Sequence, residues 1–467
     1  MTLVLHGGVV RTMDPARPLA RSIVIDGDTI AALDAEPAGA ERIDLDGGCV
    51  LPGFTDAHVH FPTWAVTRRE LQLHGSGDEI LARVAAAVPE VPPGRWLRGF
   101  GWTADGWEPS LAALDAATGD VPVALLAHDW HSLWVNSAGL AHAGGNLERA
   151  GGEVDLAAGV LREEAAWSFR DRFTVATHEE MVEATREALP VAAARGVTAI
   201  HCKDGLIGSR EVYAELREEL PFRVWQSLPA KRLDERPDYV KAYMDGTLGS
   251  RTARLLDGSG VQITSREEFE EIVRAATAAG VPVAVHAIGD SANRDALDAF
   301  AAVPGAIRPR IEHAQCLHPD DLQRFAALGV TASIQPSMAV TDAPVAERLW
   351  ADRLEGAYAY RSLHASGARL ALGSDAPVEE MDPLLGLRDA VLRDWRPHEA
   401  LDLQAALEAL IVTPTWLSGD ADRRGRLRPG MLADLVVLDR DPFADLAGAR
   451  VVNTYLGGKQ VSPIRHR

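Results

Sequence analysis

Two histidines stand two residues apart, His58 and His60, at the end of the apolar segment LPGFTDAHVH at residues 51–60. Alternate side chains of a β-strand point to the same face, and neutral imidazole is the commonest protein ligand for transition metals. The pair can therefore bind one metal ion. Such pairs also occur as hydrogen-bonded structural residues, so the metal interpretation depends on further ligands elsewhere in the chain.

Four other strand-like runs carry a chemically suitable group at or near their carboxyl ends. They contain Lys241 in YVKAYMDG, His286 in VAVHAIGD, His313 in RIEHAQ and Asp375 in ALGSDAP. In a parallel barrel, active sites are built at the carboxyl ends of the strands. Five strands that each supply such a group predict one metal site. Its expected ligands are His58, His60, Lys241, His286, His313 and Asp375.

Lysine is rare in this chain, with four lysines against 43 arginines. Wherever either cation would serve, the sequence uses arginine. A lysine at position 241 therefore indicates chemistry that arginine does not supply, such as a primary amine that can lose its proton and be modified.

The alternation of apolar runs with helix-like segments predicts an α/β fold with a TIM-like (β/α)8 barrel at residues 53–423. Nine runs read as strands, at residues 53–60, 121–128, 197–201, 223–228, 239–244, 281–287, 310–314, 330–335 and 370–373. A barrel of this type holds eight strands, so one run must lie outside it. The closely spaced runs at 223–228 and 239–244 are the most suspect.

The segments outside the barrel strands predict two further parts. Short strands broken by glycine at both chain ends, residues 1–52 and 424–467, predict one small β-sandwich domain formed by both termini. The spacing between barrel strands leaves room for an inserted cap or lid around residues 64–120 and 137–165. Loops of this length in a compact domain are usually functional.

Composition limits the classes of function. A net charge of −20 over 467 residues disfavours a nucleic-acid partner, because phosphate binding requires a basic patch. No stretch approaches the roughly 20 apolar residues of a membrane helix, and the start lacks a basic secretory signal. Three scattered cysteines, Cys49, Cys202 and Cys316, argue against a disulfide framework. We expect a cytoplasmic protein that acts on a small molecule.

The chain resembles the amidohydrolase superfamily nearly end to end. The ligand order is that of the family: HxH on the first strand, lysine near the fourth, histidines on the fifth and sixth, and aspartate on the eighth. The phrases LPGFTDAHVH and LRPGMLADLVVLD resemble the segments that lead into and out of the family's barrel. VKAYMDGTLGSRTA, HAIGD and GVLREEA resemble the amidohydrolase family 3 branch, which includes N-substituted formamide deformylases.

The resemblance implies a binuclear centre of two divalent metal ions, zinc by family habit. His58 and His60 are implied to hold one ion, and His286 and His313 the other. Lys241 is implied to be carbamylated and to bridge both ions. Its chemistry agrees, because an ammonium has no lone pair, a carbamate offers two oxygens, and burial favours the neutral amine that carbamylation requires. The alternative, ranked second, is an ion pair with Asp245.

The resemblance also implies a reaction. Asp375 would bind one metal ion and act as general base and acid, with a metal-bridging hydroxide as the nucleophile. The expected enzyme hydrolyses a non-peptide C–N bond, an amide or an N-acyl or N-formyl group. Its expected substrate is a small molecule, with aromatic compounds among the candidates. The alternatives are a deaminase on the same fold, which typically lacks the bridging lysine, and an inactive scaffold, which would have lost ligands. Family habit predicts a homodimer.

A second group of residues is predicted to contact substrate. His131, in HDWHSLWVN at residues 128–136, resembles part of a substrate loop and is expected to polarise the carbonyl or bind substrate. His201, Trp102, Trp130 and Arg251 are expected to bind substrate. Each has a structural alternative: a hydrogen-bonded rim position for His201, core packing for the tryptophans, and a loop carboxylate partner for Arg251.

Overall fold

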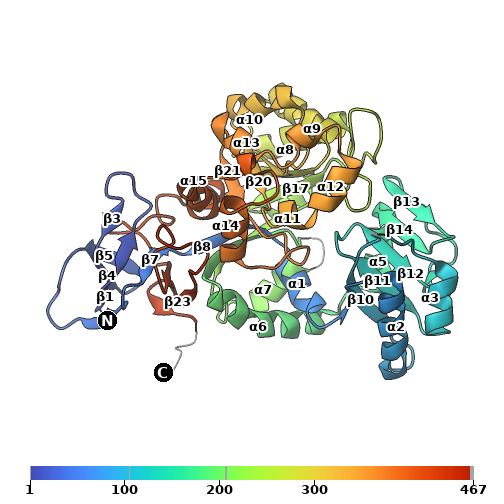
Figure 1. Ribbon diagram of the computed structural model, residues 1–467, viewed down its shortest axis with the longest axis horizontal. Helices are drawn as coiled ribbons and strands as arrows, with labels where there is room; N and C mark the ends of the chain where they lie inside the picture. Colours follow the sequence, from blue (N-terminus) through green and yellow to red (C-terminus); the bar gives the residue numbers. More distant parts are fainter. Residues whose placement is uncertain (1, 105, 206–207, 463–467) are drawn as a thin grey trace.

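A computed structural model describes residues 2–104, 106–205 and 208–462 (Figure 1). Residues 463–467 of the predicted terminal segment lie outside the described residues. None of the helices within the described ranges combines the length and the apolar character needed to cross a bilayer.

Eight parallel strands form the central sheet, in the order β21-β20-β19-β18-β17-β16-β15-β8. They are β8 (Phe54–Val59), β15 (Val197–Cys202), β16 (Arg223–Leu228), β17 (Tyr239–Tyr243), β18 (Val283–Ala287), β19 (Arg310–His313), β20 (Thr331–Ile334) and β21 (Leu370–Leu372). Beyond β21, the backbone N–H of Asp375 donates to the carbonyl oxygen of His58 at 2.7 Å. A side chain at Gly373 would collide with the His58 backbone, so this glycine permits the close approach. The predicted barrel is confirmed.

Helices surround the barrel (Figure 1). They are α1 (Phe61–Thr67), α6 (His178–Ala194), α7 (Ser209–Glu215), α8 (Arg266–Ala279), α9 (Asp290–Ala302), α10 (Leu322–Leu328), α11 (Met338–Thr341), α12 (Ala343–Leu349), α13 (Tyr360–Ala365), α14 (Pro383–Val391), α15 (Leu403–Leu407) and α16 (Thr413–Ser418). Local sequence sets their ends: Ser265 and Glu268 form a capping box at the start of α8, and Gly280 ends it in a left-handed conformation. Short 3-10 helices, with one π-helical turn at Glu408–Val412, complete the connections.

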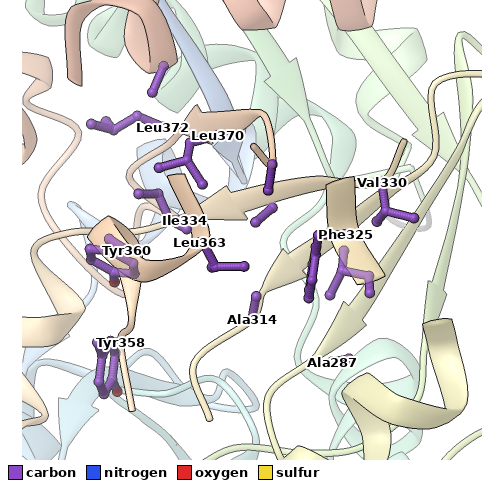
Figure 2. Packing of buried hydrophobic residues seen from close by; sticks show 14 of the residues in the cluster. Ala287, Ala314, Phe325, Val330, Ile334, Tyr358, Tyr360, Leu363, Leu370 and Leu372 are labelled. Carbon is purple, nitrogen blue, oxygen red and sulfur yellow. The ribbon is translucent and has the colours of Figure 1, made fainter. Parts of the chain in front are cut away.

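The main apolar core lies between the barrel strands and these helices. Val, Ile and Leu side chains of the strands pack against the inner faces of α10 and α13, represented by Phe325 and Leu363. Figure 2 shows this packing around Ile334, Leu370 and Leu372. Strands buried on both faces read as continuous apolar runs, which is why the sequence revealed them.

The two chain ends form two more sheets. One has the order β5-β4-β1-β6, from β1 (Thr2–His6), β4 (Ile23–Asp26), β5 (Thr29–Leu33) and β6 (Glu41–Asp44). The other has the order β24-β23-β22-β7-β2-β3, from β2 (Val9–Arg11), β3 (Leu19–Ala20), β7 (Cys49–Pro52), β22 (Leu435–Leu438), β23 (Val451–Leu456) and β24 (Lys459–Gln460). Leu5 and Ile23 of the first sheet share one apolar cluster with Val437 and Tyr455 of the second, as in a β-sandwich.

A mixed sheet lies on the opposite side of the barrel, at the right of Figure 1. Its order is β13-β14-β12-β11-β10-β9, from β9 (Leu71–Gln72), β10 (Leu97–Trp102), β11 (Val123–Ala127), β12 (Ser132–Val135), β13 (Gly152–Asp155) and β14 (Val160–Glu163). Its chain segments also contain α2 (Gly77–Ala87), α3 (Leu111–Thr118), α4 (Ser137–Ala141) and α5 (Glu164–Phe173). We call this unit the inserted sheet.

The inserted sheet corrects one prediction. The ninth apolar run, at residues 121–128, is β11 of this sheet, whereas the suspected runs at 223–228 and 239–244 both belong to the barrel as β16 and β17. All five residues of β11 are buried, because it lies between β10 and β12 and is covered on both faces. A fully buried strand has the same apolar sequence in either sheet.

Candidate metal centre

The expected ligands gather at the carboxyl ends of the barrel strands, as predicted for a site in a barrel. They line one cavity of about 530 Å³ between the barrel and the inserted sheet. Those that line it are His58, His60, Lys241, His286, His313 and Asp375.

Three of these side chains form a compact cluster. His58, His60 and Asp375 each offer one ligand atom, and these atoms lie within 4.8 Å of one another. The Nε2 atom of His58 is 3.1 Å from Oδ1 of Asp375, and Nε2 of His60 is 3.5 Å from the same oxygen. Two imidazoles and one carboxylate form a donor set suited to a divalent transition metal.

Buried carboxylates orient both imidazoles of the cluster. Nδ1 of His58 donates to Glu312 at 2.8 Å, and Nδ1 of His60 donates to Asp204 at 2.8 Å. These bonds place the proton on Nδ1 and leave the Nε2 lone pair directed at the cluster. The sequence analysis did not identify Glu312 or Asp204. Glu312 is one residue before His313, and Asp204 follows Lys203, but neither spacing reveals a partner on another strand.

The other two histidines lie beside this cluster. The ring centroids of His286 and His313 are 4.5 Å apart, and those of His58 and His313 are 4.9 Å apart. Nδ1 of His313 is buried and has no hydrogen-bond partner in the part of the chain that the structure describes; it lies 4.0 Å from Oδ2 of Asp375. An orphaned buried nitrogen at this position fits a metal ligand. Nε2 of His286 donates to the carbonyl oxygen of Gly246 at 3.1 Å, which leaves Nδ1 with the lone pair.

Lys241 is buried, and its amine lies 4.5 Å from the ring centroid of Tyr243. Within the described ranges it has no ion pair with Asp245, whose carboxylate instead accepts backbone N–H groups of Arg254, Ile288 and Gly289. Burial lowers the pKa of Lys241 to about 8. Its amine therefore loses a proton far more readily than that of an exposed lysine. The neutral amine is the form that carbamylation requires.

Asp375 is held by the first barrel strand. The carboxylate of Asp56 accepts the backbone N–H and the hydroxyl of Ser374, at 3.0 and 2.6 Å, and the backbone N–H of His58 at 3.1 Å. These bonds tie the backbone before Asp375 to the backbone that carries His58. Burial opposes ionisation of Asp375, but the imidazoles of His58 and His313 outweigh it and hold its pKa below the usual range.

The inserted sheet brings His131 to the same cavity. The ring centroid of His131 is 5.3 Å from that of His286, and its Nδ1 donates to Glu163 at 2.6 Å. Glu163 is fully buried and also accepts a hydrogen bond from Thr252. Burial opposes protonation of His131, but the Glu163 carboxylate raises its pKa above the usual value. The sequence analysis quoted Glu163 within GVLREEA without assigning it a role.

The remaining predicted substrate residues lie in three places. Trp130 lines the metal cavity, nearly parallel to the His60 ring at 6.4 Å. His201 is absent from the cavity lining: it is buried inside the barrel, where its ring nitrogens contact Ser418 and Arg310, both at 2.8 Å. Trp102 and Arg251 line a second cavity of about 370 Å³ instead. The structure therefore does not bring these last three residues to the metal cavity: His201 is buried inside the barrel, and Trp102 and Arg251 line the second cavity.

The walls of the metal cavity are aromatic on one side. Trp167 lies 5.0 Å from His131 and 5.4 Å from Tyr243, measured between ring centroids, and its indole N–H donates to the carbonyl oxygen of Trp130. These rings and the His58, His60 and Asp375 cluster give the cavity an aromatic side and a polar side.

The sequence model described as the amidohydrolase family matches residues 41–462, nearly the whole chain. The chain belongs to the amidohydrolase family. As a member of this family it is a hydrolase that acts on carbon–nitrogen bonds.

Named relatives and a solved structure agree with this assignment. The amidohydrolase is 30% identical to the protein LONG AFTER FAR-RED 3 of Arabidopsis thaliana, over 99% of this chain and 91% of the relative. It is 26% identical to an N-substituted formamide deformylase of Arthrobacter pascens, over 98% of this chain and 97% of the relative. An uncharacterised metal-dependent hydrolase of Pyrococcus horikoshii OT3 superposes with a TM-score of 0.77 at 28% identity, covering 95% and 98% of the two chains.

Proposed function

We propose that this amidohydrolase cleaves an amide, N-acyl or N-formyl bond of a small aromatic molecule. The observation that carries the proposal is one cavity that joins the His58, His60 and Asp375 cluster to the aromatic wall of Trp130 and Trp167. The similarity to an N-substituted formamide deformylase supports the bond type.

The proposed centre holds two divalent ions, zinc in the first instance. His58 and His60 would hold one ion, His286 and His313 would hold the other, and Asp375 and a carbamylated Lys241 would supply the remaining oxygen ligands. Bound ions of this kind polarise a carbonyl group and lower the pKa of water from about 15.7 towards 7. The orphaned His313 nitrogen and the readily deprotonated Lys241 amine support this donor set.

Asp375 is the proposed proton carrier. Because its pKa is held low, it is ionised at neutral pH and can accept the proton of the attacking water. The oxygen of that water bonds to the scissile carbonyl carbon, the C–N bond breaks, and Asp375 returns the proton to the departing amine. The products are one carboxylic acid and one amine.

His131 is the proposed partner of the substrate carbonyl. Glu163 holds its Nδ1 proton, which aims the other side of the ring into the cavity beside His286. In its doubly protonated form, which the raised pKa of His131 favours, Nε2 can donate a hydrogen bond to the carbonyl oxygen as negative charge develops on it. Trp130 and Trp167 would contact the aromatic part of the substrate.

The test is turnover of a panel of aromatic N-formyl and N-acyl amines by zinc-loaded protein, with product amine and acid measured together. We expect the two products in equal amounts, loss of activity in His58→Ala, and wild-type activity in His364→Ala, which removes an exposed histidine of α13. Release of ammonia from aminopurines without cleavage of this panel would favour a deaminase. No turnover of either class by metal-loaded protein would contradict the proposal.

A further inference from the structure

The second cavity lies beside the metal cavity, between the inserted sheet and the barrel. Its lining includes Trp102 of β10, Arg162 of β14, Arg251 of the loop after β17, and Val345 and Leu349 of α12. Figure 1 shows α12 on the side of the barrel that faces the inserted sheet. His128, Asp129, Gly249 and Asp342 line both cavities, so they form a shared wall.

Two arginines of this cavity have no carboxylate partner among the described residues. Arg162 and Arg251 make no ion pair there, whereas arginines such as Arg223 and Arg254 are paired with aspartates at 2.8 and 2.5 Å. Guanidinium groups without a partner beside a cavity are available to bind an anion.

The structure brings these two arginines to the same place. Arg162 lies directly opposite Ser132 on the neighbouring strand, so both side chains are on one face of the inserted sheet. The hydroxyl of Ser132 is 2.7 Å from the hydroxyl of Ser250, the residue before Arg251. Backbone hydrogen bonds within residues 247–252 hold Arg251 in its turn.

The acidic groups of the shared wall are already engaged elsewhere. One oxygen of Asp129 accepts the hydroxyls of Thr247 and Ser250, both at 2.6 Å. The carboxyl group of Asp342 accepts the Tyr358 hydroxyl at 2.5 Å. The third acidic residue of the lining, Glu108, is exposed. Among the described residues, neither Asp129, Asp342 nor Glu108 forms an ion pair with the guanidinium group of Arg162 or Arg251.

We propose that the second cavity binds a small molecule in which a carboxylate is attached to an apolar or aromatic group. The planar guanidinium forks of Arg162 and Arg251 match the two oxygens of a carboxylate. Trp102, Val345 and Leu349 supply an apolar surface for the rest of the molecule. The carboxylate belongs either to one end of the substrate or to a separate molecule.

Calorimetric titration of the zinc-loaded protein with phenylacetate tests the binding site, and 2-phenylethanol, which has no bond that the proposed enzyme could hydrolyse, is the matched neutral probe. Carboxylates also bind metal centres, so phenylacetate can bind at two sites. The informative quantity is the part of the binding that is lost when the two arginines are replaced, which we call the arginine-dependent component. We expect this component to weaken at least tenfold in Arg162→Gln/Arg251→Gln and to persist in Arg217→Gln, which removes an exposed arginine that lines neither cavity. 2-Phenylethanol should lack this component in every protein.

Metal content and thermal midpoint show whether the double variant is folded. If it is not, Arg251→Gln alone, in an exposed position, is expected to weaken the same component at least threefold. Equal affinity for phenylacetate in the wild type and in a folded arginine variant would overturn the proposal. This measurement does not depend on hydrolysis, so failure of the proposed activity would leave its outcome interpretable.

Kinetic measurements then distinguish the two sources of the carboxylate. This experiment rests on the proposed function. If the carboxylate belongs to the substrate, the double variant raises KM at least tenfold for carboxylate-bearing N-acyl amines and leaves KM for neutral ones within twofold. If it belongs to a separate molecule, phenylacetate changes the turnover of a neutral substrate in the wild type and has no such effect in the double variant.

Discussion

Glu312→Gln should weaken both the fold and the metal site, because this buried carboxylate serves three partners. One oxygen accepts Lys203 at 2.6 Å and Arg310 at 3.0 Å, and the other accepts Nδ1 of His58 at 2.8 Å. Glutamine keeps the shape but loses the charge, and its NH2 group must face at least one donor. Removing one partner of a buried charged group costs about 3–5 kcal/mol.

The loss should appear in two measurements. Urea unfolding of Glu312→Gln should show a midpoint well below that of the wild type, and zinc affinity should fall about 10–100-fold, as is usual when the partner of a metal-binding histidine is removed. Glu218→Gln, an exposed glutamate on the surface, is the matched control and should leave both unchanged. Wild-type stability together with wild-type zinc affinity in Glu312→Gln would refute the role given to this carboxylate.

Three further predictions follow from other parts of the site. Lys241→Ala should lose most activity and at least one metal ion, with partial rescue by short carboxylic acids; wild-type activity and metal content would exclude a bridging role. Glu163→Gln should lower kcat about 10–100-fold at unchanged metal content, because His131 loses the carboxylate that orients and charges it; an unchanged kcat and pH profile would contradict this. Burial raises the pKa of Asp342 to about 7, so the native state binds this proton more tightly than the unfolded chain, and stability should fall as pH rises from about 4 to 7. Measured as the thermal midpoint against pH, this fall in stability should be smaller in Asp342→Asn. An identical pH dependence in both proteins would refute the role given to Asp342.

The barrel and the positions of the expected ligands on its strands could be predicted because they depend on local sequence. Each barrel strand is a short apolar run, and most expected ligands lie near or just beyond its carboxyl end, as with His286 one residue before the end of β18, whereas Lys241 lies in the middle of β17. The inserted sheet was harder to predict. β10 contains two glycines in LRGFGW and β9 has only two residues, so neither carries a clear strand pattern.

The partners of the ligands could not be predicted for a different reason. Glu312 and Asp204 reach His58 and His60 from other strands, and only the closed barrel brings them together. The rarity of lysine was informative for more residues than Lys241. Three of the four lysines, Lys203, Lys231 and Lys241, line the metal cavity.

The most direct test of the account is the metal content of the wild-type protein. Plasma mass spectrometry would be applied to protein purified without chelator and then exposed to zinc and bicarbonate. The account predicts about two zinc ions per chain, with fewer in His58→Ala and in His286→Ala. A single ion would contradict the binuclear centre and move a deaminase ahead, and no bound ion after reconstitution would contradict a metal-dependent hydrolase altogether.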